Sequence, residues 1–163
     1  MKRFHTLIIL IMMFSIVHNA NAADTTEFNV HLQQPSCDIN VANEYPLGGL
    51  KRGVVKPAPF DVSISCDANV RTTLVASVVK GNIKPDNQHV EFLIRGTSVP
   101  NGSLLSLEDE KGTVIYVTGK DKDSFCTGSA VNRTCSVTPV TTVSWGNTST
   151  EIEAVIGLKV IYI

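Results

Sequence analysis

Four cysteines, Cys37, Cys66, Cys126 and Cys135, carry the most reactive side chains of this sequence. In an exported chain, an even number of cysteines indicates disulfides. Three pairings are possible. We favour Cys37 with Cys66 and Cys126 with Cys135, because each pair brackets a continuous segment and the first pair lies on strands expected to be neighbours. A zinc site needs ligands at short spacings such as Cys-x2-Cys, so we expect two disulfides, no metal site and no other cofactor.

The residue types used in catalysis are not arranged as an active site. His31 falls on the polar side of a short alternating segment, and His89 follows the loop sequence Pro85-Asp-Asn-Gln. No serine stands in a Gly-x-Ser-x-Gly turn. The acidic run Glu108-Asp109-Glu110 precedes Lys111-Gly112 without the spacing of a calcium loop. We therefore expect a protein that is not an enzyme.

The first 22 residues have the layout of a secretory signal peptide. Lys2 and Arg3 precede an apolar run from Leu7 to Val17, and the small residues Ala20 and Ala22 follow at cleavage spacing. The apolar run has about eleven residues, whereas a membrane-spanning helix needs about twenty. No later segment is long enough, so we expect export without a membrane span.

The remaining chain has the size and charge of a single acidic domain. Without Lys2 and Arg3, twelve of the fourteen basic residues remain against fifteen acidic ones, a formal charge of −3. Nucleic acids and anionic membranes attract clustered positive charge. We therefore expect neither as a partner.

Short segments of alternating apolar and polar residues indicate an all-β domain. Phe60 to Cys66 is the clearest of them, with Phe60, Val62, Ile64 and Cys66 on one face. Further strands are expected at 37–41, 73–79, 90–95, 104–107, 113–118 and 136–143, separated by Gly, Asn, Asp and Pro. Pro139 suggests a sheet edge or a bulge. No segment has a helical period, so we predict an antiparallel, immunoglobulin-like β-sandwich.

The C-terminal segment, Ile152 to Ile163, reads as one strand with apolar residues on both faces. One face would carry Ile152, Ala154, Ile156, Leu158, Val160 and Tyr162. An unpaired apolar strand at a sheet edge favours pairing with another chain. Only Lys159 interrupts this one.

The order of these features resembles the pilin subunits of chaperone–usher fimbriae in Gram-negative bacteria. The resemblance lies in the signal peptide, a short alternating extension, Cys37, the segment Phe60-Asp-Val-Ser-Ile-Ser-Cys66, Gly146, and a final alternating strand with the penultimate Tyr162. It covers essentially the whole chain after residue 22. It implies three parts: a signal peptide at 1–22, an N-terminal donor-strand extension at 23–36 and a pilin domain at 37–163.

The resemblance also implies an incomplete sandwich that lacks the seventh strand. In that family a periplasmic chaperone lends a strand to the resulting hydrophobic groove. At the outer-membrane usher, the N-terminal extension of a neighbouring subunit then replaces the chaperone strand. The chain would pass through the periplasm into a fimbrium on the cell surface and contribute to cell adhesion.

Site residues follow from the same resemblance, position by position. The donated side chains would be Thr26, Phe28, Val30 and Leu32. The receiving groove would be lined or bordered by Ile152, Ala154, Ile156, Leu158, Val160 and Tyr162, and the Ile163 carboxylate would anchor the chaperone.

Two features depart from the family pattern. Donor strands of the family commonly have glycine seven residues before the first cysteine, where this chain has Val30. Either the receiving neighbour has a deeper pocket, or the register of donation differs. The pair Cys126 and Cys135 is additional to the usual single disulfide and would stiffen a surface hairpin or present a contact.

Two other functions remain compatible with the residues. The first is a self-complete exported sandwich that recognises a host glycan or protein through its loops, with its C-terminal strand paired internally. The second is a periplasmic enzyme or an inhibitor, and in the inhibitor case the constrained 126–135 loop would be the active element.

Overall fold

A computed structural model describes residues 35–49, 51–144 and 151–163, within a compact unit that spans 34–163. The expected signal peptide, residues 23–34 of the expected 23–36 extension, Trp145 and Gly146 lie outside the described residues.

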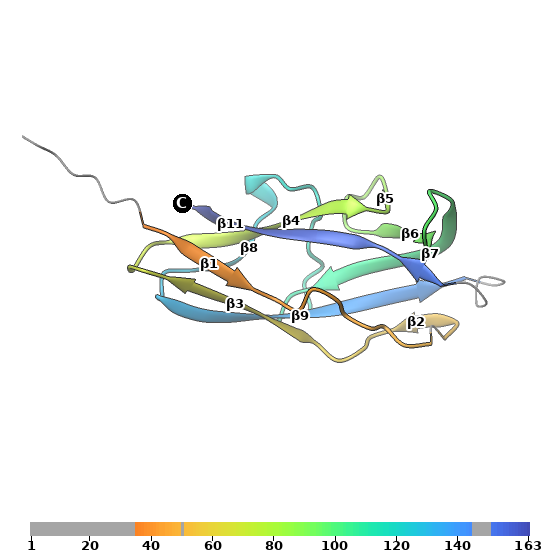
Figure 1. The fold of residues 1–163 in the computed structure, drawn as a ribbon, viewed down its shortest axis with the longest axis horizontal. Helices are drawn as coiled ribbons and strands as arrows, with labels where there is room; N and C mark the ends of the chain where they lie inside the picture. Colours follow the sequence, from red (N-terminus) through yellow and green to blue (C-terminus); the bar gives the residue numbers. More distant parts are fainter. Residues whose placement is uncertain (1–34, 50, 145–150) are drawn as a thin grey trace, which may run out of the picture. The chain divides into compact units, whose positions relative to one another are not determined.

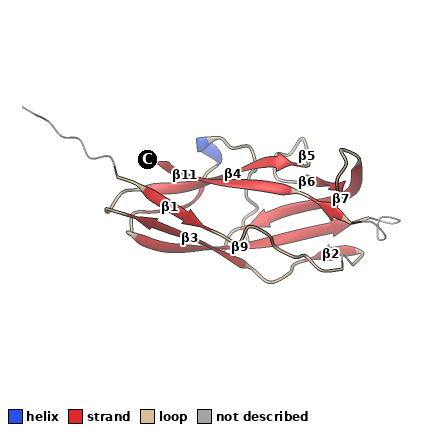
Figure 2. Cartoon of the chain, in the orientation of Figure 1, coloured by secondary structure: helices blue, strands red, loops and turns tan. Residues whose placement is uncertain are grey.

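The described residues form strands and one short 3-10 helix, so the all-β prediction is confirmed (Figures 1 and 2). The strands are β1 (Cys37–Asn40), β2 (Gly53–Val55), β3 (Phe60–Cys66), β4 (Thr72–Lys80), β5 (Asn82–Ile83), β6 (Val90–Ile94), β7 (Pro100–Glu108), β8 (Phe125–Gly128), β9 (Asn132–Val143), β10 (Ile152–Glu153) and β11 (Val155–Tyr162). The 3-10 helix η1 spans Asp121–Asp123.

Two antiparallel sheets build the immunoglobulin-like sandwich. The larger sheet has the order β1-β3-β9-β7-β6-β10, with β2 paired to β9 and β5 paired to β6. The smaller sheet has the order β11-β4-β8. Because strand side chains alternate between faces, one face of β3 and one of β4 supply buried residues to a common core that includes Val62, Ile64, Leu74 and Ala76.

The core explains why β3 was the clearest strand in the sequence. Its side chains alternate strictly between buried and exposed, with Val62 and Ile64 inside and Asp61 and Ser63 outside. β4 was harder to interpret, because Thr72 to Ala76 are all buried. Each face of that stretch is covered, so its sequence does not alternate.

The expectation of an edge or bulge at Pro139 was wrong in its first part, because β9 is an interior strand of the larger sheet. Pro139 pairs with Leu107 of β7 on one side. On the other side β3 pairs with β9 only up to Val137, and β2 pairs from Thr141 on. Pro139 therefore lies at an interruption of that second ladder, where a residue without an N–H is tolerated.

The segment 113–118 is not the strand that its alternation predicted. It makes two isolated bridges, Glu108 with Val114 and Ser77 with Thr118. These bridges join different sheets, so the segment crosses the sandwich instead of extending either sheet. Its alternation has a different cause: Ile115 and Val117 are buried in the core as the segment crosses.

The C-terminal segment is two strands and not one. Ile152 and Glu153 pair with β6 of the larger sheet, whereas the chain from Val155 pairs with β4 of the smaller sheet. The register shifts between Val155 and Ile156. The change of sheet occurs at Ala154. The alternation of apolar and polar residues in the sequence does not reveal this position.

Both favoured cysteine pairs are disulfides in the structure, Cys37–Cys66 and Cys126–Cys135. The first joins directly opposed residues of β1 and β3. The second joins β8 to β9, which belong to different sheets. The 126–135 loop is therefore a connection between sheets and not the surface hairpin expected from the sequence.

Candidate functional site

β11 is the last strand of the smaller sheet, and one of its edges is open. It pairs with β4 from Ile156 opposite Val78 to Tyr162 opposite Thr72. Within the described residues, no strand pairs with its other edge. β1 is likewise the terminal strand of the larger sheet. The main-chain groups along these two free edges have no ladder partner among the described strands.

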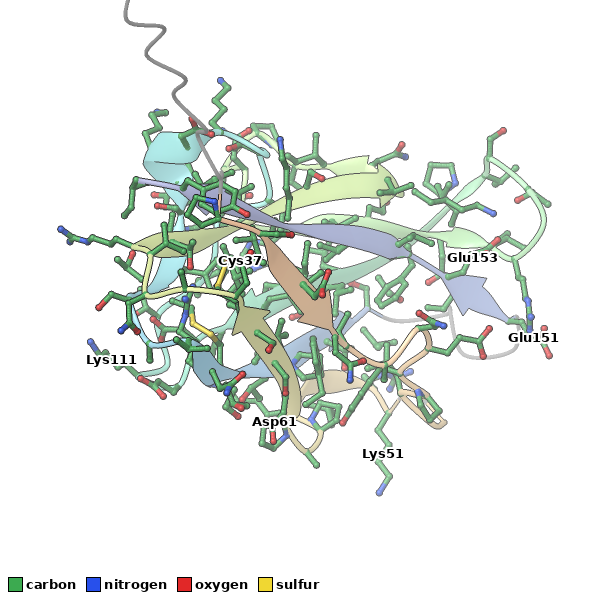
Figure 3. All side chains as sticks on the ribbon, turned by 60° about the vertical axis from the view of Figure 1, so that its left-hand side comes forward. Cys37, Lys51, Asp61, Lys111, Glu151 and Glu153 are labelled. Carbon is green, nitrogen blue, oxygen red and sulfur yellow. A yellow bond between two sulfur atoms is a disulfide. The ribbon has the colours of Figure 1, made fainter. Side chains whose placement is uncertain are left out.

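The two terminal strands face each other. β1 contacts β11, and they lie closest near Cys37 and diverge from there (Figures 1 and 3). The free edges of the two sheets therefore belong to strands that are in contact with each other.

Apolar side chains along these strands are only partly covered. From β11, Ile156, Leu158 and Val160 pack against the core but stay half-buried, and Ile39 and Val41 do the same from β1 and the residue that follows it. The adjacent interior strands differ, since Leu74 of β4 has no exposed surface. We call the five half-buried residues Ile39, Val41, Ile156, Leu158 and Val160 the open edge.

The outer face of β11 is more exposed than its face toward the core, although the sequence places apolar residues on both. Val155 is 43% exposed and Lys159 is exposed. Gly157 and Ile161 are partly covered on this face. A Cβ on Gly157 would lie 3.1 Å from Cγ2 of Val79 and 3.4 Å from Oγ of Ser77. The apolar residues of β11 therefore concentrate on the face toward the core.

The end of the chain is exposed and tied to β4. Tyr162 and Ile163 are 46% and 58% exposed. The Ile163 amide donates to the Arg71 carbonyl oxygen at 3.1 Å. The C-terminal carboxylate thus sits beside the start of β4.

The structure brings together most, but not all, of the predicted groove residues. Ala154, Ile156, Leu158 and Val160 pack against the core cluster in sequence order. Ile152 is separated from them because it pairs with Ile94 of β6 in the other sheet. The predicted donor residues Thr26, Phe28, Val30 and Leu32 lie outside the described residues.

Sequence reasoning missed the contribution of β1. Ile39 and Val41 belong to the open edge although neither was predicted as a site residue. The signal was present, since Cys37, Ile39 and Val41 alternate with polar residues. What the sequence did not contain was the pairing of β1 with β3 at the border of the sheet.

Two carboxylates that line a cavity of the described residues are engaged in local hydrogen bonds. A cavity of about 280 Å³ has among its lining residues Asp109, Tyr116, Asp123 and Phe125. Oδ1 of Asp109 accepts hydrogen bonds from the amides of Lys111 and Thr113, and Asp123 accepts one from Thr118. No group of three potential metal ligands occurs in this part of the chain. Both carboxylates thus hold local turns.

The histidine in the described part of the chain is engaged locally as well. Nδ1 of His89 lies 2.7 Å from Oδ2 of Asp86 in the turn between β5 and β6. The Gln88 amide and the His89 side chain lower the pKa of Asp86, in that order of effect. This pair is a contact within the turn.

Within the residues that the structure describes, no helix is long and apolar enough to cross a membrane.

Comparison with known proteins finds similarity in structure alone. One solved structure is a chaperone–usher pilus studied for rod uncoiling; it is 15% identical, with a TM-score of 0.57, and the match covers 88% of this chain and 97% of that chain. Another is the P pilus rod subunit PapA, 16% identical with a TM-score of 0.57, covering 85% of this chain and 100% of that one.

No family model and no curated protein matches the sequence. At this level of identity the structural likeness establishes the fold. The chain has the fold of chaperone–usher pilus subunits, an incomplete immunoglobulin-like sandwich.

Proposed function

We propose that this chain is a non-enzymatic structural subunit of a chaperone–usher pilus, polymerised by strand donation at the open edge. The observation that carries the proposal is the half-burial of Ile156, Leu158 and Val160 beside a strand edge with no described partner. On the adjacent interior strand β4, the core-facing Leu74 is fully buried.

A strand inserted between β1 and β11 would satisfy two requirements together. Its main chain would pair with the free edges of both sheets, and its alternate side chains would cover the open edge. A one-residue slip would turn those side chains outward, so the alternation also sets the register. The fold of the two pilus neighbours supports this use of the edge.

The role of each residue set follows. Thr26, Phe28, Val30 and Leu32 supply the donated side chains. The receiving set is Ala154, Ile156, Leu158, Val160 and Tyr162, joined by Ile39 and Val41 of the open edge. Ile163 offers its carboxylate as the anchoring point of a chaperone. Ile152 belongs to β10 and borders the receiving set from the other sheet.

The pathway implied is export, chaperone binding and assembly. After cleavage of residues 1–22, a periplasmic chaperone covers the open edge. An outer-membrane usher then exchanges the chaperone for the 23–34 segment of a neighbouring subunit. The resulting fimbrium lies on the cell surface and contributes to cell adhesion.

A fusion tests the proposal without any unidentified partner. A second copy of residues 23–34 is attached after Ile163 through a short flexible linker, so that the donor segment can reach the open edge of its own chain. We expect a monomer that unfolds cooperatively at a higher temperature than the unfused chain, which we expect to aggregate or polymerise. Analytical ultracentrifugation and calorimetry measure both properties.

The matched control is the same fusion with Phe28→Asp and Leu32→Asp in the added copy only. Charged side chains cannot enter an apolar site without a large desolvation cost, so this fusion should behave like the unfused chain. An unfused chain that is monomeric and cooperatively folded, and that neither fusion changes, would contradict the proposal and favour the self-complete binding module.

A further inference from the structure

Arg133 is partly exposed, and its side chain reaches from one sheet to the other. It lies on β9, on the same face as the buried Cys135 and Val137. Nη1 donates to the Thr72 hydroxyl at 2.5 Å, and Nη2 donates to the Thr72 carbonyl oxygen at 3.2 Å. The carbonyl oxygens of Cys126 and Gly128 accept further bonds at 3.3 and 3.4 Å. One side chain of the larger sheet therefore binds two strands of the smaller sheet.

The guanidinium is closely confined in this position. A Cβ on Gly128 would lie 3.0 Å from Cδ and 3.4 Å from Nε of Arg133. Nε is buried without a partner. Burial also lowers the pKa of Arg133, although arginine stays protonated near neutral pH. Because only the planar guanidinium offers several donors in a fixed fork, lysine cannot reproduce these four bonds.

The Cys126–Cys135 disulfide joins the same two sheets beside Arg133. Cys135 is two residues after Arg133 on β9, and Cys126 is itself one of the carbonyl partners of Arg133. We call Arg133, Gly128 and this disulfide, together with their partner Thr72, the cross-sheet clamp.

The clamp holds the part of β4 to which the end of β11 is bonded. Thr72 is fully buried and pairs with Tyr162. The preceding residue, Arg71, accepts the hydrogen bond from the Ile163 amide. Figure 3 shows both disulfides near the start of β1, where β1 and β11 converge. The converging end of the open edge is thus fixed from both sheets.

We propose that the cross-sheet clamp is a positioning element for strand donation: it holds Tyr162 and Ile163 in register before an incoming strand binds. A strand bonded along one edge only is prone to fray at its end. Order imposed before binding lowers the entropic cost of association. This role depends on the proposed function, since the order of Tyr162 and Ile163 matters for assembly only if a donated strand binds beside them.

The test uses the chain from Ala23 on, refolded with its disulfides intact and kept dilute enough that it stays monomeric without added peptide, and a fluorescent peptide of residues 23–34 as the probe. The variants are Arg133→Lys, Gly128→Ala and the double change Cys126→Ser with Cys135→Ser. Arg95→Lys is the control, because Arg95 makes an exposed ion pair with Glu151, away from the clamp. Fluorescence anisotropy gives the association rate, and urea unfolding gives the global stability.

We expect peptide association at least fivefold slower in each clamp variant and unchanged in Arg95→Lys. The decrease in the association rate should be larger than the measured decrease in unfolding free energy can explain. Gly128→Ala keeps every charge and both cysteines, so it reports on the clamp even if a harsher variant does not fold.

Hydrogen exchange without peptide separates positioning from general destabilisation. The Ile163 amide, bonded to the Arg71 carbonyl, should exchange at least tenfold faster in the clamp variants. The Ile115 amide, bonded to the Leu107 carbonyl at 2.8 Å, should be unaffected.

Clamp variants that bind peptide at the unchanged rate and leave Ile163 exchange unaltered overturn the clamp proposal and leave the proposed function standing. An unchanged chain that binds no peptide overturns the proposed function and with it the role of the clamp.

Discussion

The ammonium group of Lys80 lies 2.5 Å from Oε1 of Glu153, and this ion pair joins the end of β4 to β10 where the chain changes sheets. The same Oε1 accepts a hydrogen bond from the Gly96 amide at 2.8 Å, which adds the turn after β6. Glu153 thus links both sheets at the end of the open edge that carries no disulfide (Figure 3).

Glu153→Gln should make stability less dependent on acid. The hydrogen bond from Lys80 and then that from Gly96 hold the pKa of Glu153 below its ordinary value of 4.5. A carboxyl with a depressed folded-state pKa contributes stability above its ordinary pKa and loses it as the pH falls through the folded value. The original chain should therefore be more stable than the variant at pH 7, and this difference should disappear well below pH 4.5. Urea unfolding at both pH values measures it.

The control for this pH effect is Glu151→Gln. Glu151 makes an ion pair with Arg95, but both side chains are more than 60% exposed, and exposed pairs contribute little. An acid dependence that is equally altered in both variants would mean that the Lys80–Glu153 link is not its source.

Gly81→Ala should destabilise the domain strongly. Gly81 has φ +125°, and a Cβ would lie 2.5 Å from Cγ1 of the buried Val90 and 3.1 Å from the Glu91 carbonyl oxygen. Backbone strain and overpacking together should cost about 3 kcal/mol or more. Gly96→Ala is matched to it, since Gly96 also has a positive φ but open space around it, and should cost about 1 kcal/mol. Equal losses in urea unfolding would contradict the steric explanation.

Leu158→Ala and Leu74→Ala should separate binding from stability. Leu74 is fully buried, so its truncation should cost about 3 kcal/mol of unfolding free energy. Leu158 is half-buried on the open edge, so its truncation should cost clearly less. If the edge receives a donated strand, Leu158→Ala should nevertheless weaken binding of a 23–34 peptide by about tenfold, since about 1.4 kcal/mol corresponds to that factor. Peptide titration and urea unfolding give the two quantities, and a Leu158→Ala chain with unaltered peptide affinity would remove Leu158 from the receiving set.

Replacing Cys37 and Cys66 by serine should lower the unfolding free energy by about 3.6 kcal/mol, the chain-entropy value for a loop of this length. The disulfide closes a loop with a sequence separation of 29 and ties β1 to the core strand β3. The corresponding change at Cys126 and Cys135, with a separation of 9, should cost less, about 2.7 kcal/mol. The reverse order, measured in urea under oxidising conditions, would show that the cross-sheet link has a stabilising role beyond loop closure.

The sequence by itself determined the elements that depend on local alternation. β3 was predicted at its observed bounds, and β1, β4 and β6 nearly so, because each has at least one face whose side chains must be apolar to reach the core. The pairing of Cys37 with Cys66 was also accessible, because both cysteines stand on alternating segments expected to be neighbouring strands, and the structure places them opposite each other in β1 and β3.

The tertiary structure alone decided where the chain changes sheets and which strand edges stay open. Ile152 and Ile156 alternate correctly for one strand, yet they pair with β6 and β4 of different sheets. Ile39 joins Leu158 on the open edge although the two residues are far apart in the chain, and Arg133 reaches Thr72 across the sandwich. Alternation reports only whether a side chain faces inward. The alternation of one segment does not identify the strand with which that segment pairs, because pairing depends on contacts between residues far apart in sequence.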